Sequence, residues 1–333
     1  MQKIKVPLLC KGQSLNVGVL FVLVFGGAAL LEAVVGLAQW LKFSWPDWGW
    51  SYRPYGSMEN PISFAIVLMI AGLFSFAHLV FNRISVNWIL FLLLFGLGLL
   101  VSFTREAWIG FFVGALFLAA IHGWRWLAGS FGIFILLYWL LPDILQSRIA
   151  TMITLEGSSI SERFHLWRAA LYIWIDHPWV GCGFSCIESI HEAFPDHAVL
   201  KSEHFIHNSY LQILVDTGLI GLTAWMAIWV KFFAQAFRSF KNPQYFLCPD
   251  WVRFGGCAAI LAFLVASLFK THFYDQEMVM VIYAVMAFTL APSAAMPLPS
   301  GPRSIPVSAK SPRSAKGGQI DVKSGEILPD KPS

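Results

Sequence analysis

The stretch SSISERFHLWRAALYIWIDHPWVGCGFSCIESI (residues 158–190), followed after a polar interval by EHFIHNSYLQILVDTGLIG (residues 203–221), organises the rest of the chain. It is the long interval between hydrophobic segments that is rich in Arg, His, Asp and Glu. Chemistry that moves protons or binds anions needs such side chains. We therefore expect the functional residues in this stretch and a scaffold around it.

Beyond this stretch the chain is strongly apolar. Of its 333 residues, 57% are hydrophobic and only 13% are charged, whereas about a quarter of a soluble domain is charged. The mean hydropathy is +0.64 even though residues 292–333 are polar. This composition predicts an integral membrane protein, so the net charge of +4 does not indicate nucleic-acid binding.

Eight apolar runs approach the roughly 20 residues that a helix needs to cross a bilayer. The first is too long for a cleaved signal peptide and lacks a small-residue cleavage site. The sequence therefore predicts an all-α membrane protein with seven or eight transmembrane helices. The runs are Leu15–Leu41, Ile62–Phe81, Val86–Phe103, Ala107–Ile121, Trp124–Leu141, Asn208–Phe233, Phe254–Phe269 and the shorter Met278–Leu290.

The apolar runs divide the chain into five regions, with both termini in the cytoplasm. This orientation puts 15 of the 23 Lys and Arg residues on the cytoplasmic side, as the positive-inside rule expects. The regions are a cytoplasmic N-terminus (1–14), transmembrane helices 1–5 (15–141), a large periplasmic catalytic loop (142–207), transmembrane helices 6–8 (208–291) and a disordered, Pro/Ser/Lys-rich cytoplasmic tail (292–333).

Residues 161–174 of the outer loop have apolar side chains at helical spacing, with Arg163 and Arg168 elsewhere on the wheel. This pattern predicts an amphipathic helix that lies along the membrane surface. The apolar positions are Phe164, Trp167, Ala170, Leu171 and Trp174.

Cysteine and histidine spacing argues against a metal centre. The five cysteines form no CxxC pair, and His204 and His207 are three apart without the HExxH arrangement. We expect no metal and no cofactor. Cys182 and Cys186 are the one close pair, and two unpaired small hydrophobic residues are favoured there over a local disulfide.

Three arginines are candidates for binding a diphosphate at the outer membrane face. Arg105 stands between the third and fourth apolar runs, and Arg163 and Arg168 lie in the outer loop. Guanidinium groups bind phosphate oxygens in a bidentate fork. The alternatives are interfacial snorkelling for Arg105 and a solvated helix face for the other two.

His207 is the candidate catalytic residue. It stands where the chain re-enters the bilayer, and a neutral imidazole takes a proton from a hydroxyl at physiological pH. Asn208 directly follows it, His204 is its rival, and Glu203 is placed to orient either histidine. Glu32 is an unexpected charge within the first apolar run, and the sequence does not assign its role.

Four stretches together resemble the superfamily of O-antigen ligases and O-antigen polymerases, which are bacterial membrane glycan transferases. YRPYGSMENPISFA is similar to its outer-loop motif and FTREAWIGFFVG to its Ser/Thr-Arg-x-x-Trp span start. SERFHLWRAALYIWIDHPWVGCGF resembles its Arg…Trp…Asp-x-Pro-x-x-Gly-x-Gly segment, and HNSYLQILVDTGLIGL its His-Asn-x-x-Leu…Gly-x-x-Gly element. The resemblance runs from about Val34 to Trp229.

The resemblance implies a metal-independent glycosyltransferase of the bacterial inner membrane. A glycan on a polyprenyl diphosphate would pass to an acceptor hydroxyl, either on a lipid A–core sugar or on a growing polysaccharide, at the periplasmic face. His207 would be the base or would position the acceptor. Arg105 and Arg163 would hold the leaving diphosphate, with Arg168 as a substitute.

The chain also departs from the family, whose members usually have more spans than the seven or eight expected here. A shortened relative, active alone or not, is one explanation. Other function classes remain: a transporter of polysaccharide or lipid carrier, or a non-catalytic envelope scaffold. A transporter would gather polar groups near the membrane midplane, whereas here they gather at the outer face.

Overall fold

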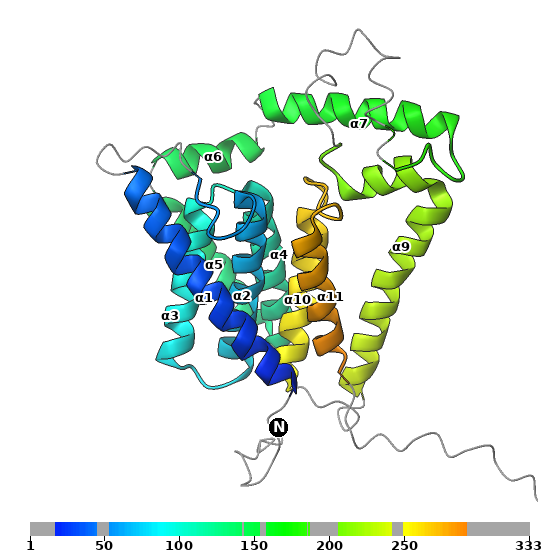
Figure 1. Cartoon of the computed structure of the whole chain (residues 1–333). Coiled ribbons are helices and arrows are strands. Elements are labelled where there is room, and N and C mark those ends of the chain that lie inside the picture. The colour runs from blue at the N-terminus through cyan, green and yellow to red at the C-terminus, as the bar shows by residue number, and fades with distance from the viewer. Residues whose placement is uncertain are drawn as a thin grey trace, which may run out of the picture. The chain divides into compact units, whose positions relative to one another are not determined.

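The computed structural model describes residues 17–44, 53–141, 143–153, 158–184, 186, 206–241 and 249–291 (Figure 1). Every regular element in these ranges is a helix, which confirms the predicted all-α fold. The predictions for the N-terminus (1–14) and for the C-terminal tail (292–333) concern residues outside the described ranges. The helices are α1 (Val17–Ser44), α2 (Pro61–Phe81), α3 (Val86–Val101), α4 (Arg105–His122), α5 (Trp124–Leu140), α6 (Asp143–Ile153), α7 (Ser158–Asp176), α9 (Ser209–Lys241), α10 (Asp250–Ala266) and α11 (Gln276–Thr289).

Each of the eight apolar runs of the sequence overlaps one helix, from α1 to α5 and from α9 to α11. Four helices are long and apolar enough to cross a membrane: Val17–Lys42, Pro61–Phe81, Arg105–His122 and Ser209–Arg238. Three shorter apolar helices accompany them: Val86–Val101, Trp124–Leu140 and Gln276–Thr289. The chain is therefore a multi-pass membrane protein, and the crossing by seven or eight helices remains a prediction.

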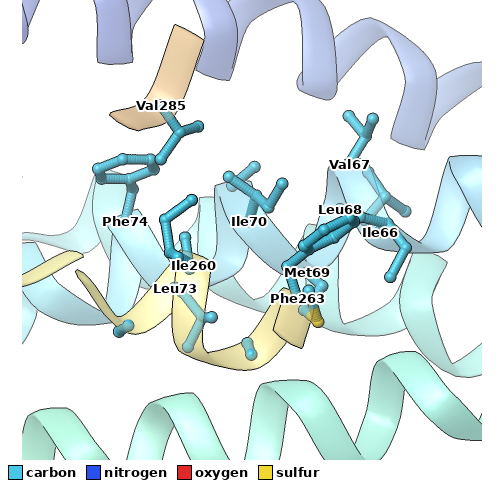
Figure 2. Packing of buried hydrophobic residues seen from close by; sticks show 14 of the residues in the cluster. Ile66, Val67, Leu68, Met69, Ile70, Leu73, Phe74, Ile260, Phe263 and Val285 are labelled. Atoms are coloured by element: carbon cyan, nitrogen blue, oxygen red, sulfur yellow. The ribbon is translucent and has the colours of Figure 1, made fainter. Parts of the chain in front are cut away.

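The helix α2 forms the centre of the core. Its side chains are apolar around the whole circumference, which is the pattern of a helix buried on all sides. It packs against α3, α4 and α10, and Leu68, Ile70 and Phe263 are among the completely buried residues that fill the contact (Figure 2). The helix begins at Pro61, where Asn60 caps it by accepting bonds from the N–H groups of Ile62 and Ser63 at 2.9 Å.

The helices α4 and α10 touch through their backbones. Gly110 and Gly114 lie one turn apart on α4, and a Cβ atom on Gly110 would come within 2.7 Å of the Ala262 carbonyl oxygen. A Cβ atom on Gly114 would stand 3.1 Å from the Ala258 carbonyl oxygen. This is the small-residue spacing that lets membrane helices approach closely.

Glu32, whose role the sequence leaves open, anchors the segment before α2 (residues 55–57) to α1. Its carboxylate accepts hydrogen bonds from the Ser57 N–H at 2.8 Å and from the Ser57 hydroxyl. Gln39 adds a second anchor, since its amide donates to the Gly56 carbonyl at 2.7 Å and accepts from the Gly56 N–H at 2.9 Å. Glu32 and Gln39 therefore hold residues 55–57 against α1.

We expect Glu32→Gln to loosen this loop. One oxygen becomes an NH₂ group that faces donors on Ser57, and leaving a donor unsatisfied costs about 1–3 kcal/mol. Thermal unfolding of the detergent-solubilised protein should shift to lower temperature. Glu59→Gln is the control because Glu59 is exposed; equal melting temperatures for the two variants would contradict the anchoring role.

The helix predicted over residues 161–174 is confirmed as α7, but part of its apolar stripe faces protein. Ala170 is buried in a small cluster with Ile206 and Val215, and Trp167 and Trp174 pack against this cluster. Phe164 and Leu171 are exposed. Part of the stripe therefore packs on α9, and the placement of α7 along the membrane surface remains a prediction.

Candidate functional site

The candidate site is built on the N-terminus of α9. Asn208 is its capping residue, and its side-chain oxygen accepts bonds from the N–H groups of Tyr210 at 2.9 Å and Leu211 at 3.1 Å. Only 6% of Asn208 is exposed. The residue proposed from sequence as a support of His207 therefore fixes the first turn of the helix directly after the histidine.

His207 has a backbone that non-glycine residues rarely adopt. Its φ is 54°, in the left-handed region, and its side chain is half-buried. Such a conformation persists where surrounding contacts enforce it, and these positions are common at functional sites. The backbone thus fixes the direction in which the side chain of His207 leaves the chain, directly before α9.

Ser209 ties this turn to the loop between α10 and α11. Its N–H donates to the Ser267 carbonyl at 2.9 Å and its hydroxyl to the Lys270 carbonyl at 2.8 Å. The same hydroxyl accepts from the N–H of His272 at 3.1 Å. Burial lowers the pKa of His272 to about 3, with the nearby Lys270 charge adding to the effect, so His272 is neutral at pH 7 and serves in packing.

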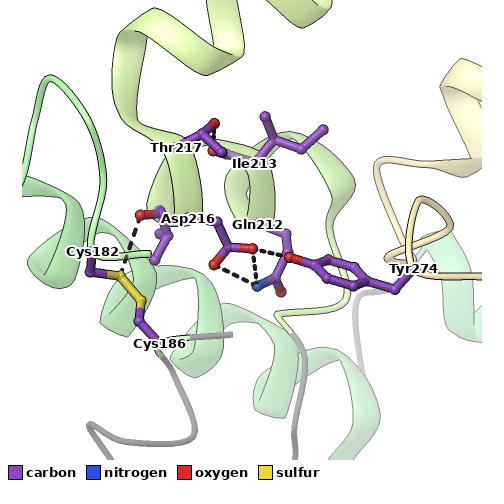
Figure 3. Close-up of a disulfide and its surroundings, with 8 residues drawn as sticks. Cys182, Cys186, Gln212, Ile213, Asp216, Thr217 and Tyr274 are labelled. Atoms are coloured by element: carbon purple, nitrogen blue, oxygen red, sulfur yellow. Dashed lines mark hydrogen bonds between the residues drawn. A yellow bond between two sulfur atoms is a disulfide. The ribbon is translucent and has the colours of Figure 1, made fainter. Parts of the chain in front are cut away.

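A buried polar network, which the sequence did not reveal, stands one turn further along α9. Both oxygens of Asp216 accept from the Gln212 side-chain amide, at 3.2 and 3.1 Å, and the Tyr274 hydroxyl donates to the same carboxylate (Figure 3). The Gln212 side-chain oxygen accepts from the N–H of Ile206 at 3.1 Å. Burial, and then the bond to Asp216, raise the pKa of Tyr274 above its usual range.

The helix α9 breaks just after this network, at Gly218, where φ is 66° and ψ is −168°. Residues 178–183, which follow α7, form hydrogen bonds with the backbone groups of α9 around the break. The N–H groups of Cys182 and Gly183 donate to the carbonyls of Val215 and Asp216 at 2.9 and 3.1 Å. In return the N–H of Leu219 donates to Pro178 at 2.9 Å and that of Ile220 to Trp179 at 3.2 Å.

These bonds join two motifs that are distant in sequence, Pro-x-x-Gly-x-Gly at residues 178–183 and Asp-Thr-Gly at residues 216–218. Gly181 and Gly218, both with positive φ, allow the two backbones to approach. A Cβ atom on Gly181 would stand 2.5 Å from the Val215 carbonyl oxygen. The glycines of both motifs therefore serve one backbone contact.

Cys182 and Cys186 form a disulfide beside this contact, with Cα atoms 5.8 Å apart (Figure 3). The preference for two unpaired thiols was wrong. Spacing alone could not decide, because it does not say whether the loop turns back on itself. Disulfides persist in oxidising compartments, which agrees with the predicted periplasmic location of this loop.

Arg105 is the first residue of α4 and is half-buried. The turn before it is held by Arg53, whose guanidinium donates to the Ser102 carbonyl and to the Thr104 hydroxyl, both at 2.9 Å. Sequence analysis had not assigned a role to Arg53. The guanidinium and the positive end of the helix dipole favour an anion here, whereas the buried carboxylate of Glu106 in the same first turn opposes one.

Arg163 and Arg168 both lie on α7 but point differently. Arg163 is half-buried, whereas Arg168 is exposed and donates to the Tyr172 hydroxyl at 3.3 Å on its own helix. The helix α7 packs on α9, while α4 packs on α2, α5 and α10. The structure therefore places the arginines on separate groups of helices, and it directs Arg168 toward Tyr172.

Two further candidates, Glu203 and His204, lie outside the described residues. Within the described ranges, no three His, Cys, Asp or Glu side chains gather closely enough to hold a metal ion.

Comparison with known proteins agrees with the resemblance seen in the sequence. Residues 89–226 match the family described as O-antigen ligase. A stretch of 112 residues is 31% identical to the O-antigen ligase of Pseudomonas aeruginosa, and it spans 33% of this chain and 25% of that protein. The matched family segment contains Arg105, Arg163, Arg168, His207, Gln212 and Asp216.

Proposed function

We propose that the chain is a membrane glycosyltransferase that takes its glycan from a polyprenyl diphosphate, since residues 89–226 match the family described as O-antigen ligase. The acceptor is a hydroxyl of a lipid A–core sugar, and transfer occurs at the periplasmic face of a bacterial inner membrane. The observation that carries the proposal is the coincidence of the family segment with the fixed His207 turn.

In this proposal His207 acts on the acceptor. The acceptor oxygen attacks the anomeric carbon, the bond from that carbon to the diphosphate oxygen breaks, and the hydroxyl proton passes to the imidazole. A positioned base of this kind contributes about 10²–10⁴-fold to a rate. The left-handed backbone of His207 and the cap at Asn208 support this role because they fix the direction of the Cα–Cβ bond of His207.

The arginines act on the leaving group. Arg105 meets the diphosphate at the N-terminus of α4, where the helix dipole adds to its charge. Arg163 contributes from α7, and Arg168 does so only after leaving Tyr172. Stabilising the charge that develops on the leaving oxygen is commonly the largest catalytic contribution, and no metal is required for it.

A polymerase differs from this ligase only in its acceptor, which is then another glycan repeat unit. The same donor chemistry serves both. A transporter or a scaffold needs neither a base nor a leaving-group site, so glycan transfer by the purified protein separates these classes.

We expect the purified protein in liposomes to transfer glycan from a polyprenyl-diphosphate donor, with the same rate in EDTA as in its absence. The assay contains lipid A–core in one arm and a lipid-linked repeat unit in the other, and gel mobility of the product identifies the acceptor. Loss of transfer in EDTA would contradict the metal-independent mechanism. Absence of transfer to both acceptors would overturn the enzyme assignment.

A further inference from the structure

The network on α9 joins the loop between α10 and α11 to the residue before His207. Tyr274 donates to Asp216, and Asp216 accepts from Gln212 (Figure 3). Gln212 in turn accepts from the N–H of Ile206. Asp216 is only 5% exposed and Gln212 is buried as well. A carboxylate placed this deeply is retained only with good hydrogen bonding, and here it receives bonds from two side chains.

The direction of each bond in the network is set by the carboxylate. A carboxylate only accepts, so the Gln212 amide must turn its NH₂ group toward Asp216. Its oxygen then points the other way and meets the N–H of Ile206. The charge at position 216 therefore determines whether the backbone before His207 finds an acceptor.

We propose that Asp216 is a positioning residue, which holds His207 in its left-handed backbone conformation through Gln212 and Ile206. This inference rests on the proposed transferase function for its catalytic consequence, but not for its structural content. We assign no proton transfer to Asp216 itself, because only 5% of it is exposed to an incoming hydroxyl and it accepts bonds from Gln212 and Tyr274.

Two isosteric substitutions separate positioning from direct catalysis. In Asp216→Asn, a single oxygen must accept from both Gln212 and Tyr274, and the new NH₂ group opposes other donors. In Gln212→Glu, two carboxylates face each other. Each single variant should lower kcat by about 10–100-fold with little change in KM for the donor, since a small misplacement of a catalytic group has effects of this size.

The double variant Gln212→Glu/Asp216→Asn reverses the bond between the two positions without changing the total charge. The Glu oxygens then accept from the N–H of Ile206 and from the Asn NH₂ group, and the Asn oxygen accepts from Tyr274. Every bond of the network is restored, so kcat should return to within about threefold of wild type, in a strongly non-additive cycle.

Thr217→Val is the matched control, because Thr217 is the neighbour of Asp216 on α9 and its hydroxyl donates only to the Ile213 carbonyl, at 2.6 Å. It should transfer glycan like wild type. Recovery in the double variant supports positioning. A double variant as slow as the slower single variant, or single variants as fast as wild type, would overturn it.

Hydrogen–deuterium exchange tests the same network without any glycan. The amide of Ile206 should exchange about tenfold faster in each single variant and at the wild-type rate in the double variant. In Asp216→Asn the Gln212 amide is no longer forced to turn its oxygen toward Ile206, and in Gln212→Glu repulsion between the two carboxylates displaces the oxygen that accepts from Ile206. If wild type transfers no glycan at all, the proposed function fails while exchange still decides the positioning role. Unchanged exchange in both single variants would then reject it.

Discussion

His207→Ala should reduce glycan transfer by about 10²–10⁴-fold, the usual contribution of a positioned general base. The imidazole stands on a left-handed backbone next to the cap of α9, and the proposal assigns it the acceptor proton. The variant is compared with wild type in the liposome assay, at a saturating concentration of the lipid-linked donor, so that the loss is measured in kcat.

A second substitution at this position separates loss of the base from misfolding of the turn. Asparagine adopts the left-handed region more readily than other non-glycine residues, so His207→Asn should keep the turn while removing the base. His165→Ala serves as the control, because His165 is an exposed histidine on α7. Transfer by His207→Asn at more than about a third of the wild-type rate would refute the role of His207 as base.

Gly181→Ala should destabilise the protein by about 3 kcal/mol. Left-handed backbone costs alanine roughly 1–2 kcal/mol, and overpacking adds typically 1–3 kcal/mol. The added Cβ atom would stand 2.5 Å from the Thr217 nitrogen and from the Val215 carbonyl oxygen, so the contact between α9 and residues 178–183 must open. Thermal unfolding in detergent measures the loss.

Gly183→Ala is the matched comparison. Gly183 also has a positive φ, of 104°, but a Cβ atom there would meet nothing within 4 Å. Only the backbone strain remains, so this variant should lose less stability than Gly181→Ala, by about 1–3 kcal/mol. If the two variants unfold at the same temperature, the close contact at Gly181 contributes nothing beyond its backbone conformation.

The helices could be predicted from the sequence because a bilayer demands long apolar runs, and a run of this length has one structural meaning. Their packing could not. The helix α2 lies at the centre and α5 largely at the surface, although both are apolar throughout. Side chains that face lipid and side chains that face protein are equally apolar, so periodicity does not separate them.

Site residues could be predicted where the position of a single residue in the sequence was unusual. His207 and Arg105 stood out as ionisable groups at the ends of apolar runs. The network around Asp216 did not stand out, because Tyr274 lies 58 residues further along the chain. Gln212 and Asp216 are four apart and share one face of α9, which was the available sign of a buried polar pair.

Partners that are distant in sequence also explain why the role of Glu32 and the disulfide could not be predicted. Glu32 finds its partner Ser57 only when a loop folds back over α1. The disulfide depends on the turn at residues 181–183, whose shape is set by bonds to α9. In each case a local sequence suggests a polar or reactive group, and a distant element decides what that group does.

The glycine contact between α4 and α10 has a mechanical consequence. At Gly110 and Gly114 the two backbones leave no room for a side chain between them, which restricts sliding of one helix along the other. Arg105 begins α4, and the loop that follows α10 holds Ser209 beside His207. The N-terminus of α4 and the turn at His207 are thus linked through α10, whereas Arg163 lies on α7, which packs on α9.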